Sequence, residues 1–462
     1  MLLCALDMMV PTHQTTGIWR HPDADVEQYR DLDFWIRHAR LLEAAGFDAM
    51  FFADVAGVYD VFDGSGATAI REGMQYPMLD PLLAVSALAA ATERIGFGVT
   101  ASVSHEQPYL LARRFATLDH LTRGRVAWNI VTSYQRSATR NLGLGELVPH
   151  DERYDRADEF MDVVYALWEG TFAPGALVRD ADAGVYLDPD RVHGAGHEGR
   201  WFSVPGPGLT LPGPQGTPFL FQAGSSPRGL RFAARHAEAL FFSGTTPANV
   251  RRLTDALPAL LAEAGRPRDA IRSITSVTVV AAETGDAARA RLDDYARHVD
   301  EDAALALFAG WTGLDLARLS PDDVLEDVEI EGNRSALQSF TSMGPDRAWT
   351  VRDVAAFMAI GARGPVIVGS GETVADELER WMREAGVDGF NVDYALRGMD
   401  LPAFAEHVAP VLRARGHLSV SPGHAPREGV QSAEAALAST LRGRILGTDT
   451  LRDDHPGAAF RR

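Results

Sequence analysis

The strongest constraint on the fold of this chain is a repeated alternation of two kinds of segment. Short runs rich in β-branched and aromatic residues are separated by longer segments with the period of amphipathic helices, a pattern typical of parallel βα units. Eight such runs predict a closed (β/α)8 barrel of the TIM type, in the α/β class. The candidate strands cover residues 2–6, 49–53, 95–100, 126–131, 219–222, 239–242, 274–281 and 389–392.

The length of 462 residues allows either one elaborated barrel or roughly two to three ordinary domains. We expect one barrel domain over 1–415, in which the connections 170–218 and 303–365 are too long for plain links and form insertions. The first insertion is rich in Gly and Pro, which predicts an irregular excursion over one barrel end. Residues 416–462 form a C-terminal extension that we expect to be either disordered or strapped across a partner subunit.

The charge balance restricts the partners of the chain. Its formal net charge is −19, so nucleic acid and anionic membrane surfaces would be repelled. The N-terminus lacks a basic leader, and no apolar run is long enough to cross a bilayer, so we expect a cytoplasmic protein. The single cysteine, Cys4, excludes an internal disulfide and a thiolate metal cage.

All 44 basic residues are arginine, because the chain contains no lysine. Pyridoxal phosphate enzymes and class I aldolases need a lysine amine, and a P-loop needs the lysine of its motif. These classes are therefore excluded. An anionic ligand must be held by arginine, by hydroxyl groups or by backbone N–H groups at a helix start.

Three apparent motifs do not meet the requirements of their chemistry. The glycines from Gly143 lack both a third glycine and a preceding strand, which disfavours a dinucleotide fold. His193 and His197 are separated by glycines, so a zinc-binding helix is not expected. The segment 224–228 ends in Arg228 where a nucleophile elbow needs glycine, which disfavours a serine hydrolase. We predict no metal site.

Small polar residues follow the predicted strands where a barrel enzyme builds its active site. Asp54 follows the second strand, Thr100 ends the third, and Thr132 and Ser133 follow the fourth. The loops at the C-terminal ends of barrel strands carry the functional groups of such enzymes. These four side chains are therefore candidates for ligand binding.

Two predicted helix starts are candidate anion sites. Residues 224–227 combine glycine and hydroxyl groups before a helical run over 228–239, which suits a phosphate. A serine N-cap followed by proline explains the same residues without a ligand. His150 and Tyr154 stand at a second helix start, for which a capping box with solvated charges is the alternative.

Five segments follow one another along the chain at characteristic spacing. They are GIWRHPDA from Gly17, FFADVAGVYDVF from Phe51, TLDHLTRGRVAWNIVTS from Thr117, HDERYDRADEF from His150 and FQAGSSPRGLRFAARHAEALF from Phe221. Together they resemble the bacterial luciferase-like superfamily, specifically its branch of nitrilotriacetate, dibenzothiophene sulfone and long-chain alkane monooxygenases. The resemblance covers nearly the whole chain, and the tail RILGTDTLRDDHPGAAFR also resembles the C-terminal arm of that branch.

The resemblance implies FMN as cofactor, supplied in reduced form by a separate flavin reductase. Tyr154 and the two serines at 225 and 226 would hold its phosphate, whereas Asp54 and Thr100 would lie nearer the isoalloxazine. The implied cofactor contacts are Asp54, Thr100, Ser133, His150, Tyr154, Ser225 and Ser226.

The resemblance also implies three residues around the reactive face of the flavin, namely His13, Tyr59 and Gln75. Each has a plainer interpretation: His13 as a loop-capping histidine, Tyr59 as a core aromatic and Gln75 as a solvated turn residue. The implied reaction uses O2 and a C4a-(hydro)peroxyflavin to oxygenate a small organic substrate, with the insertions acting as lids. His13 would donate to the distal oxygen, because imidazole titrates near neutral pH.

Two departures concern the substrate. The alkane enzymes have histidines where this chain has Tyr134 and, in the later insertion, Leu307, which puts alkane hydroxylation in doubt. An apolar substrate is suggested by aromatic residues that are equally typical of packing, namely Trp19, Phe62, Trp201, Phe202 and Trp311.

Two other functions remain open. A deazaflavin (F420)-dependent oxidoreductase of the same superfamily would transfer hydride without oxygen. A noncatalytic flavin-binding subunit would support a paralogous partner. The resemblance further implies a homodimer or homotetramer.

Overall fold

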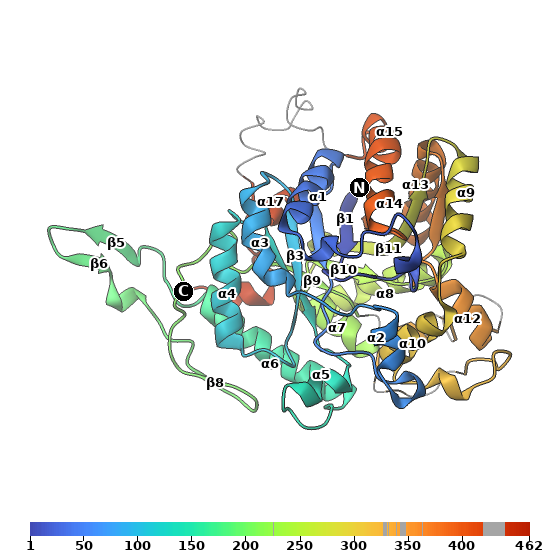
Figure 1. Cartoon of the computed structure of the whole chain (residues 1–462). Helices are drawn as coiled ribbons and strands as arrows, with labels where there is room; N and C mark the ends of the chain where they lie inside the picture. The colour runs from blue at the N-terminus through green and yellow to red at the C-terminus, as the bar shows by residue number, and fades with distance from the viewer. Residues whose placement is uncertain are drawn as a thin grey trace.

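Eight parallel strands close into a barrel in the computed structural model of this chain (Figure 1). The structure describes residues 1–224, 226–326, 330, 332–338, 340–341, 348–362, 364–418 and 439–462. Neighbours around the barrel follow the order β1, β2, β3, β4, β9, β10, β11 and β13, and β13 pairs with β1. These strands are β1 Leu2–Asp7, β2 Ala49–Phe52, β3 Gly96–Ser102, β4 Val126–Val131, β9 Phe219–Gln222, β10 Ala239–Phe242, β11 Arg272–Ala281 and β13 Gly389–Asp393. The predicted fold is confirmed, and all eight predicted runs form barrel strands.

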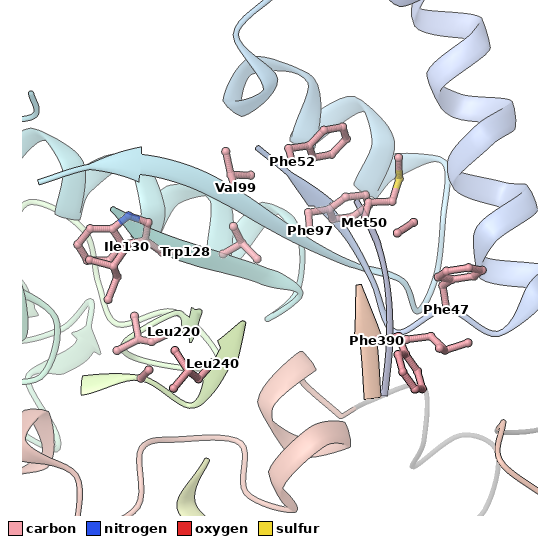
Figure 2. Packing of buried hydrophobic residues seen from close by; sticks show 14 of the residues in the cluster. Phe47, Met50, Phe52, Phe97, Val99, Trp128, Ile130, Leu220, Leu240 and Phe390 are labelled. Atoms are coloured by element: carbon pink, nitrogen blue, oxygen red, sulfur yellow. The ribbon is translucent and has the colours of Figure 1, made fainter. Parts of the chain in front are cut away.

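Aromatic side chains fill the barrel interior. The ring of Phe241 lies 4.3 Å from that of Phe51 and 5.3 Å from that of Phe221, measured between centroids. Gly98 makes room for these rings, because a Cβ atom there would lie 3.1–3.3 Å from Phe51 and Phe221. The outward faces of the strands pack against the helices, as Figure 2 shows. The barrel is therefore a packed core and not a pore.

The helices around the barrel begin at side chains that cap their first N–H groups. Asp31 accepts from two backbone N–H groups at the start of α1, and Ser370 and Thr246 accept at the starts of α13 and α8. None of the described helices is long and apolar enough to cross a bilayer. The helices are α1 Leu32–Ala45, α2 Ala67–Arg71, α3 Pro81–Ala90, α4 Pro108–Leu121, α5 Arg136–Asn141, α6 His150–Trp168, α7 Pro227–His236, α8 Pro247–Glu263, α9 Gly285–Ala296, α10 Glu301–Thr312, α11 Arg334–Gln338, α12 Val351–Met358, α13 Gly371–Ala385, α14 Arg397–Ala403, α15 Ala409–Ala414 and α17 Leu441–Leu446.

One strand of the main sheet was missing from the prediction. β12, Val366–Gly369, pairs in parallel with residues 278–281 at the end of β11. The run is only four residues long and follows directly on the 303–365 insertion, so no period in the sequence separates it from the insertion.

The 170–218 segment carries two short hairpins. The first joins β5 Leu177–Asp180 to β6 Val185–Leu187 and projects away from the barrel (Figure 1). The second joins β7 His197–Glu198 to β8 Ser203–Val204 and is fastened to α6, because Glu159 accepts the backbone N–H groups of residues 200–202.

The 303–365 segment builds a second apolar cluster. α10 and α12 pack against each other, and Tyr59 from the loop after β2 belongs to the same cluster. Gly310 admits the Tyr59 ring, because a side chain at this position of α10 would collide with it. This insertion therefore lies against the loops that follow the barrel strands.

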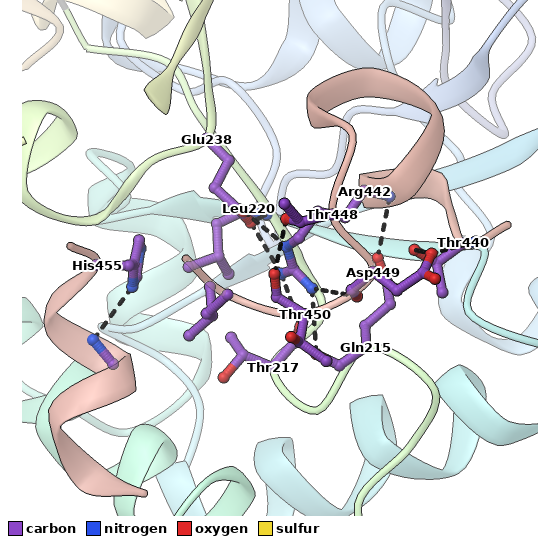
Figure 3. Close-up of polar contacts among 12 residues, drawn as sticks. Gln215, Thr217, Leu220, Glu238, Thr440, Arg442, Thr448, Asp449, Thr450 and His455 are labelled. Atoms are coloured by element: carbon purple, nitrogen blue, oxygen red, sulfur yellow. Dashed lines mark hydrogen bonds and ion pairs between the residues drawn. The ribbon is translucent and has the colours of Figure 1, made fainter. Parts of the chain in front are cut away.

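Residues 439–462 close the N-terminal end of the barrel. Leu441 at the start of α17 belongs to the interior cluster and contacts Gly96 at the start of β3. The neighbouring Arg442 is fully buried and forms hydrogen bonds of 2.6 and 2.9 Å with the carboxylate of Glu238 (Figure 3). It also donates to the carbonyl oxygens of Gln215 and Thr217.

The expected contact of the tail with a partner subunit stays a prediction, and residues 419–438 lie outside the described residues. The described residues 439–462 pack on the barrel of their own chain. The reason is the buried Arg442–Glu238 pair, which satisfies both charges only when the arm is in place. Sequence polarity alone could not identify which arginine is buried.

Candidate active site

A cavity of about 400 Å³ opens at the C-terminal ends of the barrel strands. The interior rings Phe51 and Phe241, with Leu6, contribute to its lining. Every predicted site residue that the structure describes also lines it, and Ser225 lies outside the described residues. These residues are His13, Asp54, Tyr59, Gln75, Thr100, Ser133, His150, Tyr154 and Ser226. The structure therefore brings together residues that are up to 213 positions apart (226 minus 13) in the sequence.

Three buried amide side chains line the cavity from the strand ends. Asn129 on β4, Gln222 on β9 and Asn391 on β13 each have a side-chain oxygen without a partner among the described residues. Asn129 is oriented by its Nδ2, which donates to the Thr100 hydroxyl at 2.8 Å. Buried polar atoms without partners are costly, so such a group is a strong sign of a ligand position. None of the three was predicted from the sequence, although Asn129 and Asn391 interrupt apolar strands and Gln222 ends one.

Hydroxyl groups gather at one side of the cavity. The Tyr154 hydroxyl contacts those of Thr132 and Ser226, and burial raises the pKa of Tyr154, so the phenol keeps its proton at neutral pH. Ser226 also caps α7 by accepting the Gly229 N–H at 3.1 Å. Cβ atoms at Gly224 and Gly229 would lie 2.9 and 2.7 Å from the Tyr154 hydroxyl. The capping interpretation of Ser226 is thus correct, and it coexists with a cradle of hydroxyls.

The start of α6 adds basic groups to the same side. Arg153 is buried, lines the cavity and donates to the carbonyl oxygen of Ser133 at 2.5 Å. Burial lowers the pKa of His150, while its contact with Asp151 at 2.6 Å opposes that shift. A capping box is not formed, because no side chain caps this helix and Glu152 pairs with Arg200 instead.

Two cavity residues have backbone conformations that side chains rarely adopt. Ser133 has φ 51° and Gln75 has φ 49°, both in the left-handed region. Such residues are commonly held at functional sites by their surroundings. Ser133 is held through its hydroxyl, which donates to that of Ser102 at 2.7 Å.

Tyr59 is the centre of a hydrogen-bonded cluster at the cavity wall. Its hydroxyl donates to Gln75 Oε1 at 3.0 Å and accepts from Trp311 Nε1 at 3.2 Å. The hydroxyl of Tyr134 lies 3.2 Å away. Gln75 in turn donates to the backbone carbonyl of His13 at 3.2 Å. The three residues predicted around the reactive centre are therefore in one connected group.

The carboxyl group of Asp54 is a weaker acid than an ordinary aspartate side chain. Burial, with the nearby carboxylate of Asp80 as the next cause, raises its pKa to about 7. A carboxyl group in this state can donate as well as accept a hydrogen bond near neutral pH.

The two positions at which this chain differs from the alkane enzymes, Tyr134 and Leu307, lie at different places relative to the cavity. Tyr134 lines the cavity, whereas Leu307 is fully buried in the cluster around α10 and lies outside the cavity lining. Trp311, one helical turn after Leu307, is the residue of α10 that lines the cavity. It is also the only one of the five suggested aromatic residues in the lining.

The model of the luciferase-like monooxygenase family matches residues 10–389. The chain belongs to this family. It is 44% identical over 462 residues to the dimethyl-sulfide monooxygenase of Hyphomicrobium sulfonivorans, covering 100% of this chain and 93% of that one.

Two further proteins are also similar over nearly their full length. The long-chain alkane monooxygenase of Geobacillus thermodenitrificans (strain NG80-2) is 39% identical, over 99% of this chain and 97% of that protein. A crystal structure of a riboflavin lyase with modified FMN and riboflavin superimposes with a TM-score of 0.90 at 37% identity, covering 100% and 99% of the two chains. The resemblance seen in the sequence segments is thereby confirmed.

Proposed function

We propose that this protein is the oxygenase component of a two-component monooxygenase, which uses O2 and reduced FMN from a separate reductase to oxygenate a small, mainly apolar substrate. Its membership in a monooxygenase family supports the reaction class. The observation that carries the proposal is the cavity itself, which joins a cradle of hydroxyls to three amides whose oxygens have no partner among the described residues.

The residues present fit FMN. Its phosphate requires donors, which the hydroxyls of Tyr154 and Ser226 and the start of α7 would supply without a lysine. Its ring requires both donors and acceptors along one edge, and the amides of Asn129, Gln222 and Asn391 offer both. The glycines at 224 and 229 leave the space that a side chain would fill.

When bound in reduced form, FMN supplies the electrons that activate O2. The reaction converts reduced FMN, O2 and substrate into oxidised FMN, oxygenated substrate and water. Trp311 and Tyr59 would exclude bulk water, because they close the cavity wall between α10 and the β2 loop. His13 would exchange a proton at Nε2, the ring atom without a partner among the described residues.

The substrate is expected to be small and uncharged. The cavity is near the lower end of the size range of small-molecule sites, so a flavin leaves little further space. The wall around Tyr59 consists of phenol, indole and amide groups, which carry no charge. We test a small sulfide and an alkane first, because two relatives are named dimethyl-sulfide monooxygenase and long-chain alkane monooxygenase.

The proposal is tested with purified protein, a general flavin reductase, FMN and O2. Hydrogen peroxide release is measured with and without a sulfide, an alkane, a sulfone and an aminopolycarboxylate. We expect one of the first two to lower peroxide release and to yield a product heavier by one oxygen atom. Peroxide release that no compound lowers, together with tight deazaflavin binding, would favour the hydride-transfer alternative.

A further inference from the structure

A buried carboxylate lies directly behind His13. Asp393, the last residue of β13, is 2% exposed, and its Oδ1 lies 3.2 Å from Nδ1 of His13. His13 lines the cavity, whereas Asp393 is outside the lining. The two residues are 380 positions apart, and closure of β13 onto β1 brings them together.

The surroundings of Asp393 show which partner carries the proton. The Tyr394 backbone N–H donates to Oδ1 at 2.8 Å. The Gln14 amide, oriented with its nitrogen toward this site, donates to Oδ2 at 3.3 Å and to the Gly361 carbonyl at the same distance. A carboxylate with donors on both oxygens acts as an acceptor. The hydrogen of the His13 contact therefore resides on Nδ1.

The opposite ring nitrogen is left toward the cavity. Nε2 of His13 is buried and has no hydrogen-bond partner among the described residues. With Nδ1 protonated, the neutral ring presents the lone pair of Nε2. The ring is also supported by Tyr394 at 5.7 Å between centroids, and Gln75 holds the His13 carbonyl.

We propose that Asp393 is a positioning residue that fixes the tautomer of His13, so that Nε2 can take a proton from a group in the cavity and return it. The carboxylate stabilises the positively charged ring that forms in between, as carboxylate–imidazole pairs do in other enzymes. This role rests on the proposed function, because the proposed reaction is what requires a proton to be exchanged at Nε2.

The first test is a mutant cycle on coupling, measured as product formed per O2 consumed with reduced FMN. Asp393→Asn and His13→Ala are each expected to lower coupling about tenfold or more. The double variant should match His13→Ala within about twofold, because Asp393 acts only through that ring. Losses that multiply in the double variant would overturn the proposal.

A matched control separates positioning from packing. Asp400 is an equally buried carboxylate in the following helix α14, and it accepts the N–H groups of Ala395 and Leu396 and the Tyr295 hydroxyl. Asp400→Asn should lose similar stability but keep its coupling. Equal loss of coupling in this control would show a general packing effect and would contradict the proposal.

A second readout does not depend on turnover. In protein labelled with 15N-histidine, the His13 signals are identified by their absence in His13→Ala. We expect Nδ1 to show the shift of a protonated ring nitrogen in the wild type. A neutral ring protonated at Nε2 would overturn the proposal, even if no substrate is ever found. Failure of the proposed function and failure of this inference are thus distinguishable.

Discussion

The two ends of the barrel contrast in how their buried polar groups are satisfied. At the N-terminal end, Arg442 enters the protein interior and uses its guanidinium on Glu238 and on three backbone carbonyls. At the C-terminal end, Asn129, Gln222 and Asn391 keep side-chain oxygens without partners among the described residues. Arg442 at the first end thus has all its contacts within the chain, whereas the amides at the second end keep oxygens that a ligand can use.

The largest expected effect is at the closed end. Arg442→Ala leaves the buried Glu238 carboxylate unpaired, and we expect unfolding free energy to fall by about 3–5 kcal/mol. Urea titration followed by circular dichroism measures this loss. The exposed Arg352, paired with Asp322, is the control, and its replacement should cost less than about 1 kcal/mol. Similar losses in both variants would remove the contrast between the buried pair and a surface pair.

The next effect concerns the hydroxyl cradle at the open end. In the proposed FMN site, Tyr154→Phe would remove one donor to the charged phosphate, so FMN affinity should fall by about 1.5–3 kcal/mol. Riboflavin, which lacks the phosphate, should bind equally to wild type and variant. Fluorescence titration of both flavins measures the difference. If riboflavin binding falls as much as FMN binding, Tyr154 does not contact the phosphate.

A smaller effect is expected in the pH dependence of stability. The pKa of Asp54 is raised to about 7 in the folded protein, so the folded state holds a proton that the unfolded state has lost. Stability contributed at this site is therefore highest below about pH 4 and is lost as pH rises through 7. We therefore compare the free energy of unfolding of Asp54→Asn with that of wild type at two pH values. The difference should favour the variant by roughly 1–2 kcal/mol more at pH 8 than at pH 4. Denaturant titration at both pH values checks this, and a constant difference would argue against a raised pKa.

The smallest change in stability is expected at the amide row. Asn391→Leu removes a buried polar group without a partner for its oxygen, so the free energy of unfolding should stay within about 1 kcal/mol of wild type or rise. FMN affinity should nevertheless fall several-fold, which flavin titration measures. A strongly destabilised variant would mean that the Asn391 amide stabilises the folded protein even without a ligand.

The barrel was predictable from the sequence because its strands are locally encoded. Residues 126–131, 219–222 and 239–242 were predicted at the bounds that the structure shows. β12 was missed because a four-residue run beside a long insertion has no distinguishing period. The buried role of Arg442 was also missed, since it depends on a partner 204 positions away.

The candidate site was predictable only in part. Asp54, Thr100 and Ser133 follow from the rule that polar residues at strand ends form the site, whereas His13 and Gln75 required the resemblance. Asn129 and Asn391 stand inside apolar strands, where alternation suggests packing and not binding. Asp393 could not be linked to His13 before the closure of β13 onto β1 was known. Pairings of this kind belong to the tertiary structure.

The arm over residues 439–462 also has a consequence for biosynthesis. It is translated only after every barrel strand, yet it carries Leu441, which contacts β3, and Arg442, which neutralises Glu238 between β9 and β10. Before residues 439–462 are available, the N-terminal end of the barrel is open and Glu238 has no counter-ion from Arg442. Completion of this end of the barrel therefore waits until residues 439–462 have left the ribosome.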